Sequence, residues 1–328
     1  MLLSWIFCLS LSWALPEAEL LARLPEVREH FASGEFKGFT SRHGERLEYY
    51  QLRHPQAQRV IILLPGRSEP IQKYAELAFD LRGLMAHIYV LSHRGQGGSQ
   101  RLLKDPQKGH VRDFRHYVDD FSDWLDQVVV PATGELERVL VAHSMGAGVA
   151  TFFMAERPSF FRRAVLSAPM FEIETAPYSE RTARYLSRAL VSIGRGAHYA
   201  PGRGPYDAAA DTFDANEVTH SPVRFELMKS IWLERPDLIV AGATSRWVHT
   251  WLEGLRSIVA KAPLIETPVL MFQAGQDTYV RPGRQNSFCE RHRACTSMEF
   301  ADAYHEILME RDEEREVALR ALTHFVTR

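Results

Sequence analysis

The sequence has no large excess of charge of either sign. Its 328 residues carry 39 Lys and Arg against 41 Asp and Glu, a formal net charge of -2. It contains no Lys-rich block and no RNA- or DNA-binding motif, so we expect no nucleic-acid partner. Hydrophobic residues make up 45% of the chain, which is too many for a disordered protein and enough for a large buried core.

Cysteine is scarce, with only three in the chain. Three cysteines form neither a disulfide scaffold nor a metal cage, and Cys289 and Cys295 have the wrong spacing for a zinc knuckle. We interpret these two as half-buried thiols, since free cysteine commonly packs as a small hydrophobic residue. A disulfide between them is the alternative if the compartment is oxidising.

Two motifs that would indicate a metal or a cofactor are incomplete. The segment HEILM at 305–309 lacks the second histidine of H-E-x-x-H, so we expect no metal. The segment HRGQGGSQ at 93–100 has glycines at 95, 97 and 98 but not at 100, so it does not match G-x-G-x-x-G. We interpret it as a structural turn and expect no cofactor.

A hydrophobic run long enough to span a membrane is also missing at the start of the chain. Residues 1–15, MLLSWIFCLSLSWAL, carry no charged side chain but fall short of the roughly 20 residues that a spanning helix needs. Ser12-Trp13-Ala14 offers a small-x-small cleavage site, although the positive region typical of a signal peptide is missing. A signal peptide, a membrane-surface anchor and a wrongly assigned start stay open.

Beyond this segment, short apolar runs alternate with helical patterns, which predicts an α/β fold with a mostly parallel sheet. We expect strands at 47–52, 60–64, 88–91, 139–142, 164–167, 269–273 and 298–300. We expect helices at 72–84, 113–128, 146–156, 283–292 and 311–326. The alternation breaks once, at 171–263, which we interpret as a helical cap inserted in a core formed by 31–170 and 264–328.

Ser144 lies between a predicted strand and a predicted helix, in VLVAHSMGAGVA. A serine on such a tight turn is exposed for nucleophilic attack, and the usual pattern is G-x-S-x-G. Ala142 replaces the first glycine here, whereas Gly146 keeps the second. A helix-capping serine is the alternative interpretation.

A nucleophilic serine needs a histidine base and a carboxylate that orients it, and in this arrangement both come from later strand ends, acid first. Asp277 follows the strand at 269–273, and His305 follows the strand at 298–300. A turn-forming aspartate and a helix-capping or surface histidine are the alternatives. Asp302 and Glu306 are rival acids, which we discount because they neighbour the base in the chain.

The chemistry also needs backbone donors for an oxyanion, one of them from the residue after the nucleophile, Met145. The loop after an earlier strand reads LPGRSE at 64–69, where Gly66 lets the backbone approach closely. We therefore expect the N–H of Arg67 to be the second donor, with an ordinary turn as the alternative.

Several stretches together resemble the monoacylglycerol lipase and lysophospholipase group of α/β-hydrolases. They are LPGRSEPIQKYAELAFDL, LSHRGQGGSQRLLKDPQKGHVRDFRHYVDDF, VAHSMGAG, LSAPMF, NEVTHSP, FCERHR and AYHEILMERD. The resemblance covers nearly everything after the first thirty residues. It implies an α/β-hydrolase fold, catalysis by Ser144, Asp277 and His305, and oxyanion donors at Arg67 and Met145. It also implies hydrolysis of a lysophospholipid. We expect a membrane-associated protein, either at an inner-membrane surface or, if residues 1–15 are a signal peptide, in the periplasm.

The predicted cap is basic between 181 and 203, where five arginines occur without an acid. Arg181, Arg184 and Arg188 recur at helical spacing opposite an apolar side formed by Tyr185, Leu186, Ala189, Leu190 and Ile193. We interpret the three arginines as contacts to a lysophospholipid phosphate or an anionic membrane surface. A solvated outer face is the alternative.

Other apolar cap residues line an acyl groove or form the core of the cap; they are Phe225, Met228, Ile231, Trp232, Trp247, Val248, Trp251 and Leu255.

The sequence thus predicts a serine hydrolase that cleaves the fatty-acyl ester of lysophospholipids through an acyl-enzyme. A monoacylglycerol lipase or general carboxylesterase is one alternative, and an acyltransferase that uses lysophospholipids is another. A lipid-binding module without catalysis is the third, because fold alone does not establish function.

Overall fold

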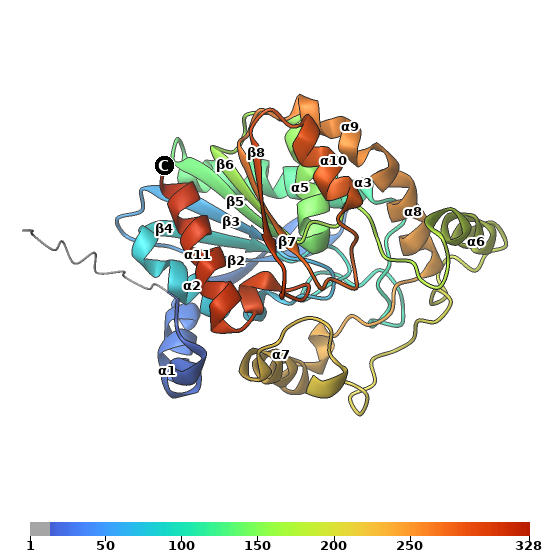
Figure 1. Ribbon diagram of the computed structural model, residues 1–328, viewed down its shortest axis with the longest axis horizontal. Helices are drawn as coiled ribbons and strands as arrows, with labels where there is room; N and C mark the ends of the chain where they lie inside the picture. Colours follow the sequence, from blue (N-terminus) through green and yellow to red (C-terminus); the bar gives the residue numbers. More distant parts are fainter. Residues whose placement is uncertain (1–13) are drawn as a thin grey trace, which may run out of the picture.

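The computed structural model describes residues 14–328 and is built on a single eight-stranded sheet in the order β1-β2-β4-β3-β5-β6-β7-β8 (Figure 1). The strands are β1 Glu35–Thr40, β2 Arg46–Leu52, β3 Arg59–Leu64, β4 Ala86–Leu91, β5 Glu137–His143, β6 Arg163–Ser167, β7 Val269–Ala274 and β8 Cys295–Phe300. β2 runs antiparallel to β1 and β4, and all other neighbours are parallel. The predicted mostly parallel sheet is confirmed.

Helices cover both faces of this sheet (Figure 1). α2 and α11 pack on one face, together with part of α1, whereas α3, α5, α9 and α10 pack on the other. The helices are α1 Glu17–Ala32, α2 Ala75–Asp80, α3 Arg115–Trp124, α4 Val130–Thr133, α5 Ser144–Glu156, α6 Glu180–Ser192, α7 Pro222–Glu234, α8 Ser245–Gly254, α9 Ile258–Lys261, α10 Gly283–Arg291 and α11 Asp312–Thr327.

The continuous apolar run in β3 is explained by this double covering. Val60, Ile62 and Leu64 belong to the cluster beneath α3 and α5. Ile61 and Leu63 belong to the cluster beneath α2 and α11. Successive side chains of a strand point to opposite faces, so a strand buried on both sides has no polar position to alternate with.

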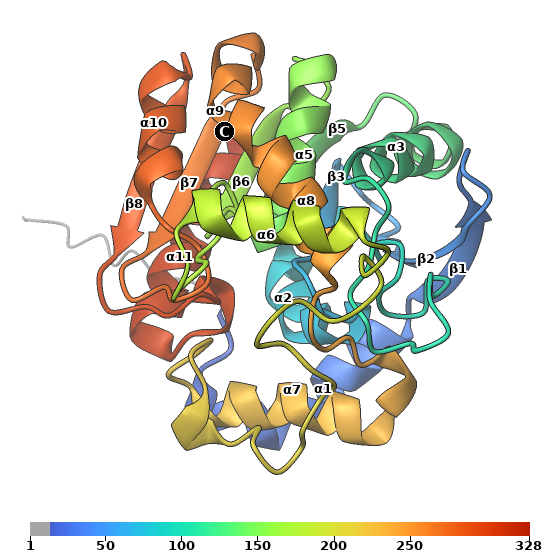
Figure 2. The same ribbon diagram turned by 90° about the vertical axis from the view of Figure 1, so that its right-hand side faces the viewer.

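The predicted cap segment contains α6, α7, α8 and α9, between β6 and β7. Figure 2 shows α6 crossing in front of the core, with α7 beside α1 below it. Val223 and Leu227 of α7 pack against an apolar cluster that includes Leu20 and Val27 of α1. Where the cap ends and the core begins stays a prediction.

β1 and α1 are missing from the predictions, and both have weak hydrophobic patterns. β1 is an edge strand with no buried residue, so the period of two that marks a half-buried strand is lacking. α1 buries only Leu20, Val27 and Phe31 and contains Pro25. Its helical pattern is correspondingly faint.

The interpretation of Cys289 and Cys295 as thiols is wrong. The two residues are joined in a disulfide, with a Cα–Cα distance of 5.2 Å. Cys289 lies on α10 and Cys295 begins β8, so the short segment between them brings the two sulfurs together.

The predicted signal peptide or anchor lies almost wholly outside the described residues. Of residues 1–15, only Ala14 and Leu15 are described, and both are buried. Among residues 14–328, no helix has the length and apolar character required to cross a membrane.

Candidate active site

Ser144 stands at the turn from β5 into α5, in a backbone conformation that few side chains adopt. Its φ is 48°, whereas His143 before it is extended. A positive φ at a non-glycine residue is strained, and such strain is common where a side chain must be presented to a ligand. The carbonyl of Ser144 accepts a hydrogen bond from the Met170 N–H at 3.0 Å, which holds the turn in place. The structure therefore has the nucleophile-elbow geometry.

The two small residues of this turn have different surroundings. A Cβ on Gly146 would collide with the carbonyl oxygens of Leu64 and Pro65, so this position requires glycine. Ala142 is fully buried within the apolar cluster beneath α5, where its methyl group packs. Alanine is therefore tolerated where the usual pattern has glycine.

The structure brings Ser144, Asp277 and His305 together at the carboxyl ends of the parallel strands. The Nε2 atom of His305 lies 2.9 Å from Ser144 Oγ, and its Nδ1 atom lies 2.6 Å from Asp277 Oδ2. An ionised Asp277 accepts from Nδ1–H, which leaves the Nε2 lone pair facing the serine hydroxyl. This is the geometry that a general base for Ser144 requires.

Asp277 is held by more than the histidine. Its other oxygen accepts hydrogen bonds from the backbone N–H groups of Tyr279 at 2.8 Å and Val280 at 3.0 Å. Burial raises the pKa of Asp277, but the hydrogen bond and charge of His305 together with these backbone donors outweigh it, so the pKa is lowered overall. The carboxylate is ionised at neutral pH.

The rival acids take other roles. Glu306 forms an ion pair with Lys73 at 2.7 Å, and the side chain of Asp302 is exposed.

Arg67 lies on the loop after β3, between two residues whose backbone N–H groups are already bonded. The Gly66 N–H donates to the Glu69 carboxylate at 2.6 Å. The Ser68 N–H donates to the side-chain oxygen of Gln96 at 3.1 Å. These bonds fix the peptide groups on either side of the one that carries the Arg67 N–H, as a preorganised oxyanion donor requires.

The side chain of Arg67 makes contacts of its own, separate from those of the backbone. It extends toward the cap, where the guanidinium lies 5.3 Å from the ring of Trp247 and donates to the Ala241 carbonyl. Burial lowers the pKa of Arg67 to about 10. This side chain therefore connects the loop to α8.

The turn at 93–100 supports the same loop. The His93 ring faces the Pro65 carbonyl with Nε2 at 2.9 Å, and the Gln96 amide donates to the Gly66 carbonyl at 3.1 Å. Burial lowers the pKa of His93 to about 4, so the ring is neutral and donates from Nε2. The motif interpreted as a structural turn braces the loop that carries Arg67.

Sequence reasoning missed a buried cluster of charged groups beneath Ser144. Glu69, Lys73 and His143 are at most 8% exposed. Glu69 contacts Lys73 at 2.8 Å and His143 Nδ1 at 2.5 Å. The only signal in the sequence was the group of charged residues Glu69, Lys73 and Glu76 in the segment SEPIQKYAEL.

The three cap arginines do not share one environment. Arg184 faces α8 and lies 3.5 Å from Glu253, whereas Arg181 and Arg188 are exposed. Arg184 and Arg188 line a cavity of about 510 Å³ together with Tyr185, His249, Glu253 and Arg256. The lining carries three arginines and a single carboxylate.

The predicted separation of a basic side from an opposite apolar side does not hold for the whole of this helix. Tyr185 is 53% exposed and Ile193 68% exposed, on the same outward side as Arg181 and Arg188. α6 packs against α8 and buries Ser187, with Ala183 and Leu190 partly buried beside it. The outward face is therefore both basic and apolar.

Most of the candidate acyl-groove residues are core or partly buried. Trp247, Trp251 and Leu255 belong to the main apolar cluster, and Phe225 is 6% exposed. The three residues of the main cluster pack with the sheet, α3 and α5, so they belong to a core that the cap shares with the rest of the protein.

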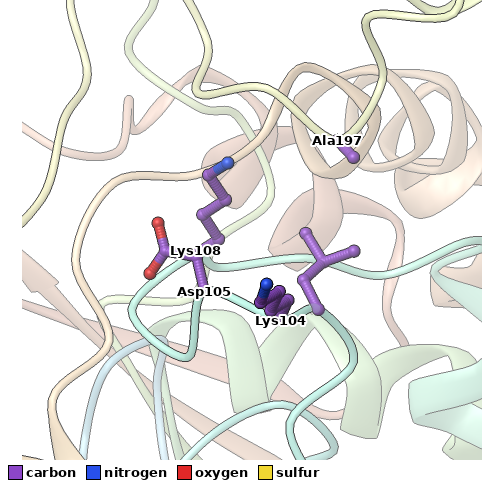
Figure 3. A pocket seen from close by; sticks show the side chains of 5 residues that line it. Lys104, Asp105, Lys108 and Ala197 are labelled. Atoms are coloured by element: carbon purple, nitrogen blue, oxygen red, sulfur yellow. The ribbon is translucent and has the colours of Figure 1, made fainter.

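A second cavity, of about 500 Å³, lies between the loop at 103–108 and the segment after α6 (Figure 3). Its lining includes Lys104, Asp105, Lys108 and Ala197, and none of these residues is a predicted site residue. The Lys108 ammonium lies 5.1 Å from the Tyr199 ring, so this contact ties the cap segment to the core loop. Within residues 14–328, no group of three His, Cys, Asp or Glu side chains is arranged to hold a metal ion.

Comparison with known proteins identifies the family of this chain. Residues 55–312 match the family model described as serine aminopeptidase, S33. The chain is 34% identical to lysophospholipase L2 of Escherichia coli over 295 residues, which cover 86% of this chain and 84% of that protein. It is 31% identical to the probable lysophospholipase L2 of Haemophilus influenzae, over 94% and 95% of the two chains. The fold is similar to that of a carboxyl esterase from Bacillus coagulans, with a TM-score of 0.69 at 13% identity over 90% of this chain and 98% of the esterase.

Proposed function

The chain belongs to the family described as serine aminopeptidase, S33. From its similarity to lysophospholipase L2 we infer that it is a carboxylic ester hydrolase that cleaves the fatty-acyl ester of lysophospholipids. The reaction class is supported by the position of His305 between Ser144 and Asp277. Its Nε2 lies 2.9 Å from Ser144 Oγ, and its Nδ1 lies 2.6 Å from Asp277 Oδ2. The substrate class is supported by 34% identity to lysophospholipase L2 over most of both chains.

We propose that Ser144 is the nucleophile and His305 the base. His305 takes the hydroxyl proton as Ser144 Oγ attacks the ester carbonyl, and the oxyanion accepts from the N–H groups of Arg67 and Met145. His305 then gives the proton to the leaving glycerol oxygen, which leaves an acyl-enzyme. Water, deprotonated by His305, releases the fatty acid, and Asp277 keeps the imidazole oriented throughout.

We further propose that Arg184 and Arg188 bind the phosphate of the substrate. They line the cavity between α6 and α8 with Arg256, and the only carboxylate there, Glu253, is shared by Arg184 at 3.5 Å and Arg256 at 3.1 Å. A phosphate would offset the remaining positive charge and accept paired hydrogen bonds from the guanidinium groups.

The outward face of α6 supports contact with an anionic membrane surface. Arg181 supplies charge there, and Tyr185 and Ile193 supply exposed apolar area. A basic helix face with aromatic and aliphatic side chains is typical of helices that lie in the headgroup region.

The first experiment measures fatty acid released from lysophosphatidylethanolamine and from a monoacylglycerol of the same chain length. We expect release from both to require Ser144, as judged by a Ser144→Ala variant, and turnover to favour the phospholipid. Preference for the neutral ester would instead indicate a monoacylglycerol lipase. Capture of the acyl group by an added lipid alcohol would indicate a transferase, and no release from either ester would favour a lipid-binding module.

The phosphate contact is tested with an Arg184→Gln, Arg188→Gln double variant. Turnover of the phospholipid should fall on the order of tenfold or more, and turnover of the neutral ester should change little. The matched control replaces the exposed Arg162 and Arg320, outside the cap, with glutamine. Equal losses on both substrates would reject the phosphate contact.

The membrane contact is tested by co-sedimentation with vesicles of phosphatidylglycerol or of phosphatidylcholine. We expect binding to the anionic vesicles alone and its loss in a Tyr185→Ser, Ile193→Ser variant. Binding unaffected by these substitutions would place any membrane contact elsewhere.

A further inference from the structure

A second histidine lies directly beneath the proposed base. The rings of His143 and His305 have centroids 4.8 Å apart. His143 directly precedes Ser144 in the chain and is 8% exposed, so it is close to the reacting groups without being open to solvent.

Both ring nitrogens of His143 face oxygen atoms. Nδ1 lies 2.5 Å from Oε1 of Glu69, and Nε2 lies 3.2 Å from the main-chain carbonyl oxygen of His305. A carboxylate and a carbonyl oxygen only accept hydrogen bonds. Because a neutral imidazole donates from one nitrogen alone, this arrangement is satisfied only by the doubly protonated ring.

Glu69 is the matching anion. One of its oxygens accepts from Lys73 Nζ at 2.8 Å as well as from His143, and the other accepts from the Gly66 N–H and the Tyr74 hydroxyl, both at 2.6 Å. Four donors occupy about all the lone-pair sites that a carboxylate offers. A proton on either oxygen of Glu69 would occupy a site where one of these donors already contributes a hydrogen atom. Glu69 is therefore ionised.

The cluster is balanced in charge. Glu306 pairs with Lys73 at 2.7 Å, so two carboxylates face one ammonium and one imidazolium. Buried ions are tolerated when they are paired and hydrogen-bonded in this way. The ionisable groups around His143, taken from every element that packs against this cluster, are Glu69, Lys73, Tyr74, His93, His305 and Glu306.

Three parts of the proposed machinery meet at this cluster. Glu69 binds Gly66, next to the oxyanion donor Arg67. His143 belongs to the nucleophile elbow and, through Nε2, fixes the backbone of His305.

We propose that His143 is a positioning residue: as an imidazolium it donates to Glu69 and to the His305 carbonyl, and so aligns the oxyanion loop, the elbow and the base. This role rests on the proposed function. Neither His143 nor Glu69 takes part in the proton transfers; they hold the groups that do. Misplacement of a reacting group by about 1 Å can reduce the rate on the order of a hundredfold.

The protonation state is tested directly by NMR of protein with ¹⁵N in its histidine rings. In the wild type we expect one ring to keep both nitrogens protonated at about pH 7.5, where an ordinary histidine is neutral. The signal should be missing in His143→Asn. In Glu69→Gln the ring should titrate below the ordinary pKa, because burial and the charge of Lys73 then act on it without the carboxylate. A neutral His143 ring at that pH would overturn the proposal, whether or not the protein hydrolyses any ester.

Kinetics with a short-chain p-nitrophenyl ester test the positioning role. We expect kcat to fall by about 10- to 100-fold in Glu69→Gln and in His143→Asn with little change in KM. The double variant should lose no more than either single variant, because both remove the same interaction.

The pH profile separates positioning from a general loss of structure. In Glu69→Gln the rate should decline as pH rises through the range where His143 loses its proton, and this decline should be missing in Glu69→Gln, His143→Asn. Circular dichroism of each variant checks that it is folded. If the wild type hydrolyses the ester and both single variants keep its kcat, the positioning role alone is overturned. A wild type that hydrolyses no ester would overturn the proposed function.

Discussion

Gly146 on α5 faces the main-chain carbonyl of Leu64 at the end of β3 so closely that a methyl group does not fit between them. The contact brings α5 against the strand that leads into the oxyanion loop. It therefore sets the distance between Ser144 and the proposed donor at Arg67.

Gly146→Ala is expected to lower the free energy of unfolding by about 2 kcal/mol or more, because the obstacle is backbone and cannot rotate away. It should also lower kcat, since α5 must shift away from the loop. Denaturant unfolding and turnover of a soluble ester measure the two effects. Gly204→Ala is the control, because a Cβ there meets no atom within 4 Å. A Gly146→Ala variant with wild-type stability would contradict the close contact.

Asp277→Asn keeps the shape of the side chain but removes the charge that selects Nδ1–H of His305. We expect kcat to fall on the order of 10⁴-fold, as is found when the orienting carboxylate of such a site is removed. Asp302→Asn, at an exposed residue near the base in the chain, should leave kcat unchanged. If the two variants lost activity equally, Asp277 would not be the orienting acid.

The three catalytic candidates could be found from sequence because their positions depend on chain order and strand ends. Ser144, Asp277 and His305 each follow an apolar run that reads as a strand, and parallel strands bring their carboxyl ends to one edge of a sheet. The pair Glu69 and His143 could not be found in this way. The two residues are 74 positions apart in the sequence. Taken alone, Glu69 resembles an ordinary acidic residue of a turn, and His143 is simply the residue before the nucleophile.

The orientation of α6 shows a second limit of prediction from sequence. Periodicity locates a basic side and an apolar side, but which side packs inward depends on the partner helix α8. Tyr185 and Ile193 are exposed because Ser187 and its neighbours take the inner positions. The thiol interpretation of Cys289 and Cys295 fails for a related reason, since spacing alone does not say whether α10 and β8 bring two sulfurs together.

The Cys289–Cys295 disulfide closes a short loop, so its removal should have a limited effect on stability. The chain-entropy relation for a loop of this length gives a loss of about 2 kcal/mol in a Cys289→Ala, Cys295→Ala variant. Unfolding in denaturant measures this, and mass spectrometry after thiol alkylation confirms the bond in the wild type. The variant should keep its kcat, because neither residue contacts the catalytic candidates. Alkylation of both cysteines in the folded wild type would show that the bond is not formed.

Arg224 of α7 is completely buried and joins four parts of the chain. It contacts Glu76 at 3.0 Å and Asp312 at 3.1 Å, and it donates to the carbonyls of Leu15 and Glu310. Arg224→Met should lower the free energy of unfolding by about 3 kcal/mol or more, because Glu76 is left buried with less compensation. The control Arg28→Met breaks an exposed pair with Glu234 and should change it by less than about 1 kcal/mol. Similar effects of the two substitutions would show that the buried cluster is not an important source of stability.

The Glu69–His143 pair makes stability depend on pH in both directions. Burial alone would raise the pKa of Glu69, but His143 and Lys73 outweigh it and lower the pKa well below 4.5. Burial alone would lower the pKa of His143, but the charge and hydrogen bond of Glu69 raise it above 6.5. The contribution of Glu69 is therefore complete above its unfolded value and is lost as pH falls through the folded pKa. That of His143 is complete below its unfolded value and is lost as pH rises through the folded pKa.

Both contributions are complete together between about pH 4.5 and 6.5, the ordinary pKa values of the two groups. We expect the stability difference between the wild type and the Glu69→Gln, His143→Asn variant to be largest in this window and to shrink on either side. Urea unfolding of both proteins across the range measures the difference directly. Because all other ionisable groups are common to the two proteins, their contributions largely cancel. A difference that stays constant with pH would mean that the pair does not carry opposite charges in the folded protein.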